Sequence, residues 1–177
     1  MHGRILWQFR DYIETRHSKG TWTAVLKTAG LEDRVYLPQA YLDEEAFSLL
    51  KATVKVSGKS AAVVLQEFGQ FTVPALLGMY SHLIKPEWRT LDVIEHAESV
   101  HGAVRRQERG AAPPYLSTRR ISPNKLIVTY DSPRKMCAFA VGVGLGLGKQ
   151  FQEAVTVQHN PCMYLGADHC KISFTVA

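Results

Sequence analysis

Residues 128–134, Val-Thr-Tyr-Asp-Ser-Pro-Arg, decide how the second half of this 177-residue chain folds and what it binds. The run Leu126–Tyr130 has the apolar and β-branched character of a strand, and a proline follows it closely. Because alternate side chains of an extended chain share a face, the Tyr130 and Ser132 hydroxyls and the Arg134 guanidinium converge. Three donors without an acceptor partner form a receptor for a carboxylate or phosphate, with Arg134 as a bidentate clamp. The alternative interpretation is an ordinary strand end with an exposed arginine.

Further strands surround this stretch. Leu116–Ile121 precedes it, and the turn signal Ser122-Pro123-Asn124 joins the two runs. Alternation predicts two more strands, at Ala154–Gln158 and Lys171–Val176. Met136–Phe151 favours a helix inserted between them, although it contains four glycines at alternate positions. The glycines lack the spacing and the Lys-Ser/Thr ending of nucleotide-binding loops, so they indicate close helix packing.

The first hundred residues favour helices, because their apolar residues recur every three or four positions. Ser60 is a candidate helix cap, and Pro74 is a candidate for the first turn of another helix. The expected helical segments run from Ile5 to Gly20, from Trp22 to Gly30, from Asp43 to Val54, from Ser60 onward, from Pro74 onward, and from Thr90 to about Gln107. The chain is therefore predicted to be one α+β domain over 1–177. It has a helical N-terminal subdomain (about 1–65) and a second part (about 66–177), in which an antiparallel sheet with one inserted helix follows the Thr90 helix.

Composition narrows the class of protein. Hydrophobic residues make up 46% of the chain, enough for a core and for an apolar ligand. The net charge is +5, but the basic residues are scattered apart from two Arg-Arg pairs, so no nucleic-acid partner is expected. The N-terminus lacks the uninterrupted apolar stretch of a signal peptide, and the run Met136–Leu147 is too short for a membrane span. These features predict a cytoplasmic protein with no membrane partner and reduced cysteines.

His101 is a candidate ligand on the predicted Thr90–Gln107 helix. It lies on an apolar stripe, whereas His96 falls on the polar side; the stripe consists of Leu91, Ile94, Ala97 and Val104. A histidine in such a place is most often a core residue bonded to a backbone carbonyl. A neutral imidazole in an apolar wall is also what a ferrous haem iron accepts as an axial ligand.

The helix histidine, the Pro113-Pro114 pair and the Tyr-x-Ser-x-Arg strand end occur in an order that resembles the heme-nitric oxide/oxygen binding (H-NOX) family of haem sensors. The resemblance begins at Met1-His2-Gly3, continues through Trp22 and Phe68-Gly69-Gln70-Phe71, and extends to the C-terminal strands. It therefore covers nearly the whole chain.

The resemblance implies a role for each of these residues. His101 corresponds to the proximal ligand of haem b, and Pro114 corresponds to a proline that presses on the porphyrin and distorts it. The residues that correspond to the binders of the haem propionates are Tyr130, Ser132 and Arg134. We expect the walls of the haem slot to include Ile5, Phe9, Phe71, Phe139 and Leu145.

Phe139 bears on which gas is bound. Oxygen-binding relatives carry a tyrosine at this position, nine residues after the motif tyrosine, and a tryptophan at the position of Phe9. An apolar residue at both places leaves bound dioxygen without a donor, which favours nitric oxide, and also carbon monoxide, as ligands. The remaining candidate donors are Trp7, Trp22 and Tyr80.

The resemblance implies a non-enzymatic nitric oxide sensor. Nitric oxide binding to ferrous haem would weaken or break the iron–His101 bond, and the resulting change of shape would regulate a signalling partner in trans. That partner would be a sensor histidine kinase or a cyclic-di-GMP enzyme.

The three cysteines of the chain suggest a second metal. His159-x-x-Cys162 is followed eight residues later by Cys170, and Cys137 completes a common zinc ligand set of three thiolates and one imidazole. These positions resemble a subset of H-NOX proteins with a C-terminal zinc site. His169 is a second candidate for the imidazole, and three unrelated buried cysteines are the alternative.

Three other functions stay open on sequence grounds. A thiol/zinc redox sensor would take cysteine oxidation as its main input. A haem-free binding module would share only the fold. An O2-binding haem protein, or an enzyme with residual peroxidase activity, would use the iron differently.

Overall fold

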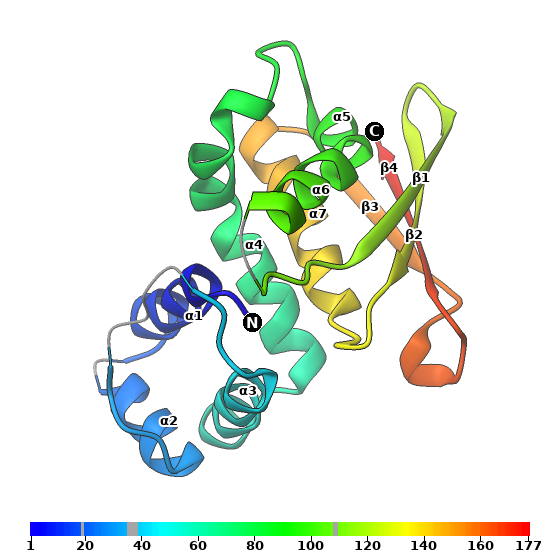
Figure 1. Ribbon diagram of the computed structural model, residues 1–177. Helices are drawn as coiled ribbons and strands as arrows, with labels where there is room; N and C mark the ends of the chain where they lie inside the picture. Colours follow the sequence, from blue (N-terminus) through cyan, green and yellow to red (C-terminus); the bar gives the residue numbers. More distant parts are fainter. Residues whose placement is uncertain (19, 35–38, 108–109) are drawn as a thin grey trace.

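A computed structural model describes residues 1–18, 20–34, 39–107 and 110–177, and Figure 1 shows its two parts. The helical part contains α1 (Gly3–Arg16), α2 (Thr21–Ala29), α3 (Asp43–Ser57) and the long α4 (Ala61–Met79). The second part contains α5 (Thr90–Glu95), α6 (Ala97–Gln107), β1 (Tyr115–Ser122), β2 (Lys125–Asp131), α7 (Cys137–Phe151), β3 (Val155–His159) and β4 (Cys170–Val176). Short 3₁₀ turns lie at Ser81–Leu83 and Met163–Leu165. The α+β fold predicted from the sequence is confirmed.

The four strands form one antiparallel sheet in the order β1-β2-β4-β3. Period-two alternation buries one face, which carries Leu126, Val128 and Tyr130 from β2 and Cys170, Ile172 and Phe174 from β4. Helix α7 packs along β3 and β4 on this side (Figure 1). The sheet therefore orients the Tyr130 side chain inward.

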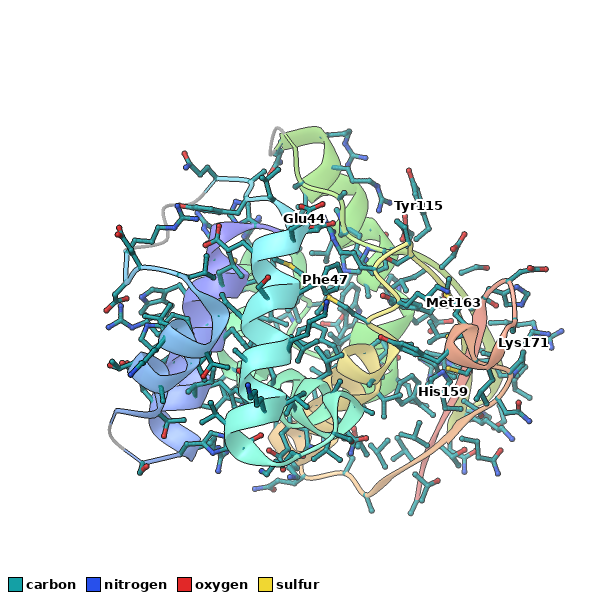
Figure 2. The ribbon with its side chains drawn as sticks, turned by 90° about the horizontal axis from the view of Figure 1, so that it is seen from below. Glu44, Phe47, Tyr115, His159, Met163 and Lys171 are labelled. Atoms are coloured by element: carbon teal, nitrogen blue, oxygen red, sulfur yellow. The ribbon has the colours of Figure 1, made fainter. Side chains whose placement is uncertain are left out.

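Two hydrophobic clusters share helix α4. Its first half contributes Val64 and Phe68 to the cluster of α1, α2 and α3, and its second half contributes Val73 to the cluster of the sheet and α7. Residue 65, the boundary expected from the sequence, lies inside this helix. In Figure 2 the α3 residues Glu44 and Phe47 lie in the helical part, and His159, Met163 and Lys171 lie at the far side in the sheet part.

Helices α4 and α7 approach closely because glycines face the contact. A Cβ added to Gly142 would lie 2.1 Å from the Gln66 carbonyl oxygen, and one added to Gly146 would lie 2.9 Å from the Gln70 Cα. On another side of α7, a Cβ at Gly144 would lie 2.1 Å from the Phe174 ring. The close packing expected of the glycine run is present.

Gly142→Ala should therefore lower the free energy of unfolding by about 2 kcal/mol or more, because the new methyl group meets backbone that has little room to move. Gly78→Ala is the matched control, since Gly78 also lies in a helix but has open space around it. That control should be neutral or slightly stabilising. Denaturant titration of both variants measures the difference, and equal stabilities would contradict this account of the contact.

The prediction that Pro74 begins a helix is wrong, because Pro74 lies inside α4. Proline cannot donate to the carbonyl four residues earlier, which belongs to Gln70. The helix continues because it is packed on both sides of this point, with Gly146 of α7 against the Gln70 backbone. Within the described ranges, no helix is both long enough and apolar enough to cross a membrane.

The single helix predicted from Thr90 to Gln107 is two helices, α5 and α6, separated at His96. The His96 Nδ1 lies 2.9 Å from the Asp92 carbonyl oxygen, and the ring stacks on Trp88 with centroids 4.2 Å apart. The Glu95 carbonyl accepts a hydrogen bond from the Thr118 hydroxyl at 3.1 Å. Side chains thus bond to carbonyls near the end of α5, and this helix ends at Glu95, six positions before His101.

Candidate functional sites

An apolar cavity of about 300 Å³ lies between α6, the Pro113-Pro114 segment, the sheet, α4 and α7. A volume of this size is at the lower end of the range for small-molecule sites. Among the described residues that line it are apolar side chains from α4 and α7, namely Val73, Leu76, Leu77, Val143 and Leu147. Its polar lining includes the groups that the sequence had marked: His101, Tyr130, Ser132 and Arg134.

His101 projects from α6 into this cavity, together with Ala97 and Val104 of the predicted stripe. Burial lowers the pKa of the His101 ring, with Glu98 and the Pro114 carbonyl opposing the shift in part. The neutral imidazole is therefore favoured. Its Nδ1 atom is buried and has no hydrogen-bond partner within the described residues. The ring also interacts with the Pro114 carbonyl, as a core histidine bonded to a backbone carbonyl would, so the unpartnered Nδ1 is the feature that favours a ligand role.

The three motif side chains, Tyr130, Ser132 and Arg134, all line the cavity. Tyr130 and Ser132 are each 3% exposed. Burial raises the pKa of Tyr130 to about 12, which keeps its phenol protonated. The Tyr130 hydroxyl accepts a hydrogen bond from the Met136 N–H at 3.1 Å, and the Ser132 hydroxyl accepts one from the Arg134 N–H at 3.3 Å.

The expectation that these donors lack an acceptor is wrong for Arg134. Its Nε donates to the Asp43 carboxylate at 2.8 Å, and one of its Nη atoms donates to the Ala112 carbonyl. Asp43 also pairs with the Met1 amine at 2.7 Å. Although burial opposes ionisation, these partners lower the pKa of the Asp43 carboxyl. A carboxylate ligand therefore has to share or displace Asp43 to engage Arg134.

The structure brings part of the expected slot wall to the cavity. Ile5, Phe139 and Pro114 line it. Phe9, Phe71 and Leu145 are not among the described residues that do. Phe9 packs edge-on against Phe68 with ring centroids 5.0 Å apart.

Helix periodicity explains why Phe71 and Leu145 are absent. Helix α4 presents Val73, Leu76 and Leu77 to the cavity, and Phe71 lies two positions before the first of them. On α7, Leu145 lies two positions from both Val143 and Leu147. A step of two residues turns a helical side chain to the other side of the helix.

The three candidate hydrogen-bond donors for a bound gas differ in whether they line the cavity. Trp22 is buried in the helical cluster, and its indole N–H donates to Asp33 at 3.1 Å. Trp7 is 50% exposed and is not among the described residues of the cavity wall. Tyr80 does line the cavity, and so does Trp88, which the sequence reasoning missed. Trp88 has no local motif, and only the tertiary fold brings it there.

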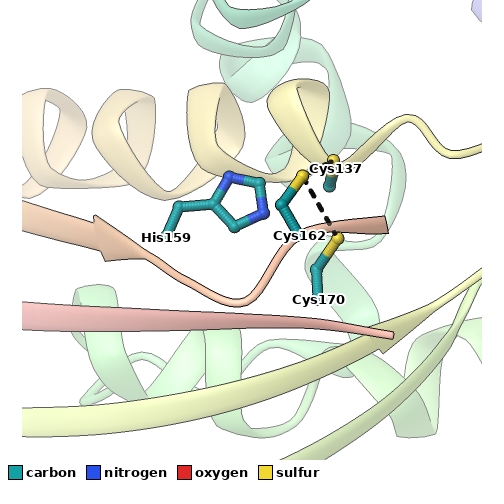
Figure 3. A group of neighbouring side chains, drawn as sticks. All are labelled: Cys137, His159, Cys162 and Cys170. Atoms are coloured by element: carbon teal, nitrogen blue, oxygen red, sulfur yellow. Dashed lines mark hydrogen bonds between the residues drawn. The ribbon is translucent and has the colours of Figure 1, made fainter. Parts of the chain in front are cut away.

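The three cysteines and His159 form a second cluster, drawn in Figure 3. Their ligand atoms all lie within 4.8 Å of one another. Cys137 comes from the start of α7 and Cys170 from the start of β4, while His159 and Cys162 flank the end of β3. His169 does not belong to this group. The Cys162 Sγ lies 3.9 Å from the Sγ atoms of both Cys137 and Cys170, so none of these thiols is in a disulfide.

Comparison with known proteins identifies the chain, because residues 2–159 match the haem-NO-binding family. The chain belongs to this family, the H-NOX domains. Members are haem-based gas sensors rather than enzymes. No curated protein matches this chain.

Solved H-NOX structures share the fold. A crystal structure of an H-NOX protein from S. oneidensis in the Fe(II)NO ligation state has a TM-score of 0.90 at 23% identity and covers 100% of this chain and 99% of its own. An NMR structure of an H-NOX domain from Shewanella oneidensis in the Fe(II)CO state has a TM-score of 0.86 at 23% identity, with coverage of 100% and 99%. A structure described as probing haem distortion in the family has a TM-score of 0.87 at 20% identity, with coverage of 99% and 95%.

The residues of this H-NOX domain fit haem. The cavity offers an apolar slot, one neutral imidazole with a buried and unpartnered nitrogen, and buried hydroxyl donors beside a guanidinium. A porphyrin needs these three features: apolar walls, an axial nitrogen and donors for its carboxylates.

The cysteine cluster fits a tetrahedral cation. Ligands at about 2.3 Å from a tetrahedral centre lie about 3.8 Å apart, close to the 3.9 Å between these sulfurs. The His159 Nε2 is buried without a partner in the described part of the chain. Burial and the neighbouring thiols raise the pKa of the Cys137 thiol, and burial raises that of Cys170. A divalent cation would remove this cost by stabilising the thiolates.

Proposed function

We propose that this H-NOX domain senses nitric oxide through haem b held in the cavity, with His101 as the iron ligand. The observation that carries the proposal is the pairing of two features in one apolar space: an imidazole whose buried Nδ1 has no hydrogen-bond partner among the described residues, and the Tyr130, Ser132 and Arg134 donors. Haem held here would supply a ferrous iron for the gas, and nitric oxide would act by weakening or breaking the iron–His101 bond. Pro114, which lines the cavity, would press on the porphyrin.

We propose that the signal passes from the haem site to the rest of the protein through helix α6. His101 is carried by α6, none of whose described residues is fully buried, so little packing opposes a shift of this helix. We propose that the subdomain of about residues 1–65 then moves against residues 66–177. A gas shifts such an equilibrium only through different affinities for the two states. The proposed receiver is a sensor histidine kinase or a cyclic-di-GMP enzyme in trans, and the proposed location is the cytoplasm.

Selection of nitric oxide over dioxygen is supported by the cavity wall. Phe139 lines it with an aromatic ring that has no hydrogen to donate, and the donor of Trp22 is already bonded to Asp33. Dioxygen on iron carries partial negative charge and is retained when a distal donor reaches it, whereas nitric oxide needs no donor. Of the three donors suggested by the sequence, Tyr80 alone lines the cavity, so it is the residue to test beside Phe139.

The test is one set of absorption spectra of the reduced protein purified with haem available, taken under argon, with nitric oxide, with carbon monoxide and in air. The expected results are a Soret band, shifts with both nitric oxide and carbon monoxide, and no stable oxy spectrum. Absence of a Soret band would support the haem-free module. A stable oxy complex would overturn the assignment of nitric oxide.

Phe139→Tyr should create a measurable oxy complex in air, because its hydroxyl adds a donor inside the cavity. A hydrogen bond to a charged group contributes about 1.5–3 kcal/mol, which corresponds to at least about a ten-fold gain in dioxygen affinity. Tyr80→Phe is the matched variant and should leave the wild-type spectrum in air unchanged. If Tyr80→Phe instead abolished an oxy complex seen in the wild type, Tyr80 would be the distal donor.

We also propose that zinc occupies the second site through Cys137, His159, Cys162 and Cys170. The tetrahedral spacing and the buried His159 nitrogen support it. Its position at the ends of β3, β4 and α7 suits a structural tie between these elements.

A further inference from the structure

The segment 112–116, which contains Pro113 and Pro114, is attached to the rest of the protein by side chains. Neither proline has an N–H to donate. Besides the pairing of Tyr115 and Leu116 with β2, the segment is anchored by side chains that bond to its carbonyls and to the Leu116 N–H. The Ala112 carbonyl accepts from Arg134, as described above. The next anchors all come from α6.

Two residues of α6 hold the segment on both sides of Pro114. The Arg105 Nη1 donates to the Pro114 carbonyl at 3.2 Å and reaches the Pro113 carbonyl at 3.5 Å. The Glu98 Oε2 accepts from the Leu116 N–H at 2.9 Å. Glu98 and Arg105 also pair with each other. The guanidinium lies over the Tyr115 ring, 4.4 Å from its centroid, and Tyr115 is labelled at the start of β1 in Figure 2.

These two residues share a side of α6 with His101. Glu98 lies three positions before it and Arg105 four positions after it, the spacing that aligns side chains on one helix face. The Arg105 and Glu98 side chains are 21% and 36% exposed, so their charges are only partly screened. The helix that carries the proposed iron ligand and the segment of the proline proposed to distort the haem are therefore joined by three hydrogen bonds and one cation–π contact.

We infer that Glu98 and Arg105 are positioning residues that make α6 and the Pro114 segment move as one body. This inference rests on the proposed haem function of His101 and Pro114. A shift of α6 then carries Pro114 with it, so the proposed iron ligand and the proline proposed to contact the haem change position together. Arginine suits the task because one planar guanidinium serves two carbonyls, a carboxylate and an aromatic face, which a lysine ammonium does not.

The first measurement is amide hydrogen exchange at Leu116 in the full chain as purified. Arg105→Gln and Glu98→Ala should each speed exchange of this amide about ten-fold, because each removes one side of the attachment. Arg105→Lys should fall between Arg105→Gln and the wild type. The matched control is Arg106→Gln, which removes the same charge from the next residue of α6, an exposed side chain. Unchanged exchange at Leu116 in all three variants, Glu98→Ala, Arg105→Gln and Arg105→Lys, would overturn the inference. This measurement does not require bound haem.

The second measurement uses the haem-loaded protein and reads the resonance Raman bands of out-of-plane porphyrin distortion. Arg105→Gln should weaken these bands by about half or more in the wild-type background, and should have no further effect in a Pro114→Ala background. Additive effects in the double variant would show that Arg105 does not act through Pro114 and would overturn the inference. A wild type with no haem would instead overturn the proposed function, while the exchange result at Leu116 would still decide whether the attachment exists.

Discussion

His101→Gly should yield protein that binds little haem, and imidazole added to the buffer should restore the cofactor. Changes to residues that merely support a metal ligand cost about 10–100-fold in affinity, so loss of the ligand itself should exceed that range. The glycine opens space at the wall of an otherwise apolar cavity, where free imidazole can replace the missing side chain. Haem content by pyridine haemochrome, with and without imidazole, measures both halves of the expectation.

Glycine also weakens the helix by about 1 kcal/mol, so the comparison needs a variant with the same cost. Ser99→Gly serves, because Ser99 is exposed on α6 and is not among the described residues of the cavity. It should retain full haem content and the wild-type ferrous spectrum. If His101→Gly behaved like Ser99→Gly, His101 would have no place at the iron.

The parts of the fold that the sequence predicted well depend on local chemistry. The Ser60 hydroxyl caps α4 by accepting from the Val63 N–H at 3.3 Å, as its position before an apolar run indicated. Alternation predicted that Tyr130 and Ser132 share a face, and both are buried. Each of these outcomes follows from residues within a few positions of one another.

The sequence-based predictions were wrong where contacts between residues far apart in the chain determine the structure. The break at His96 is supported by the Thr118 hydroxyl, which bonds to the Glu95 carbonyl from 23 positions away. The partner of Arg134 is Asp43, which lies 91 positions away on α3. No local pattern predicts either contact, because each exists only after the two parts of the chain have packed together.

The residues of the cavity wall were also hard to predict from local sequence. Aromatic residues such as Phe9 and Phe71 suit an apolar slot by type, but helix phase decides which of them face it, and phase relative to a neighbour is a tertiary property. The cysteine cluster was easier to predict because cysteines are few in this chain. His159 and Cys162 have ligand-like spacing, and Cys137, 25 positions before Cys162, was included because of the family resemblance and because every cysteine then fitted one set.

Purified, reduced protein should contain about one zinc per chain, and Cys170→Ser should lose most of it. Serine preserves the local geometry, because its hydroxyl can accept the hydrogen bond that the Met163 N–H now donates to the Cys170 sulfur at 3.2 Å. It does not supply a thiolate, and a structural zinc site depends on all four of its ligands for its affinity. Metal analysis of the two proteins, after passage through a weak chelator, measures the loss. His169→Ala should keep its zinc, because His169 neighbours Cys170 but lies outside the cluster.

Oxidation separates a structural zinc site from a redox-active one. Hydrogen peroxide removes two electrons from a pair of zinc-bound thiolates, forming a disulfide and water, and the zinc is released. The Cys162 sulfur is equally far from Cys137 and Cys170, at 3.9 Å, so geometry allows either pair. We expect Cys162 to be one member, since it is the least buried of the three. Peptide mapping identifies the bond, and the haem spectrum recorded beside it shows whether the iron is affected.

Zinc retained in full by Cys170→Ser, or absent from carefully reduced wild type, would leave three ordinary buried cysteines and would remove the basis for a redox sensor.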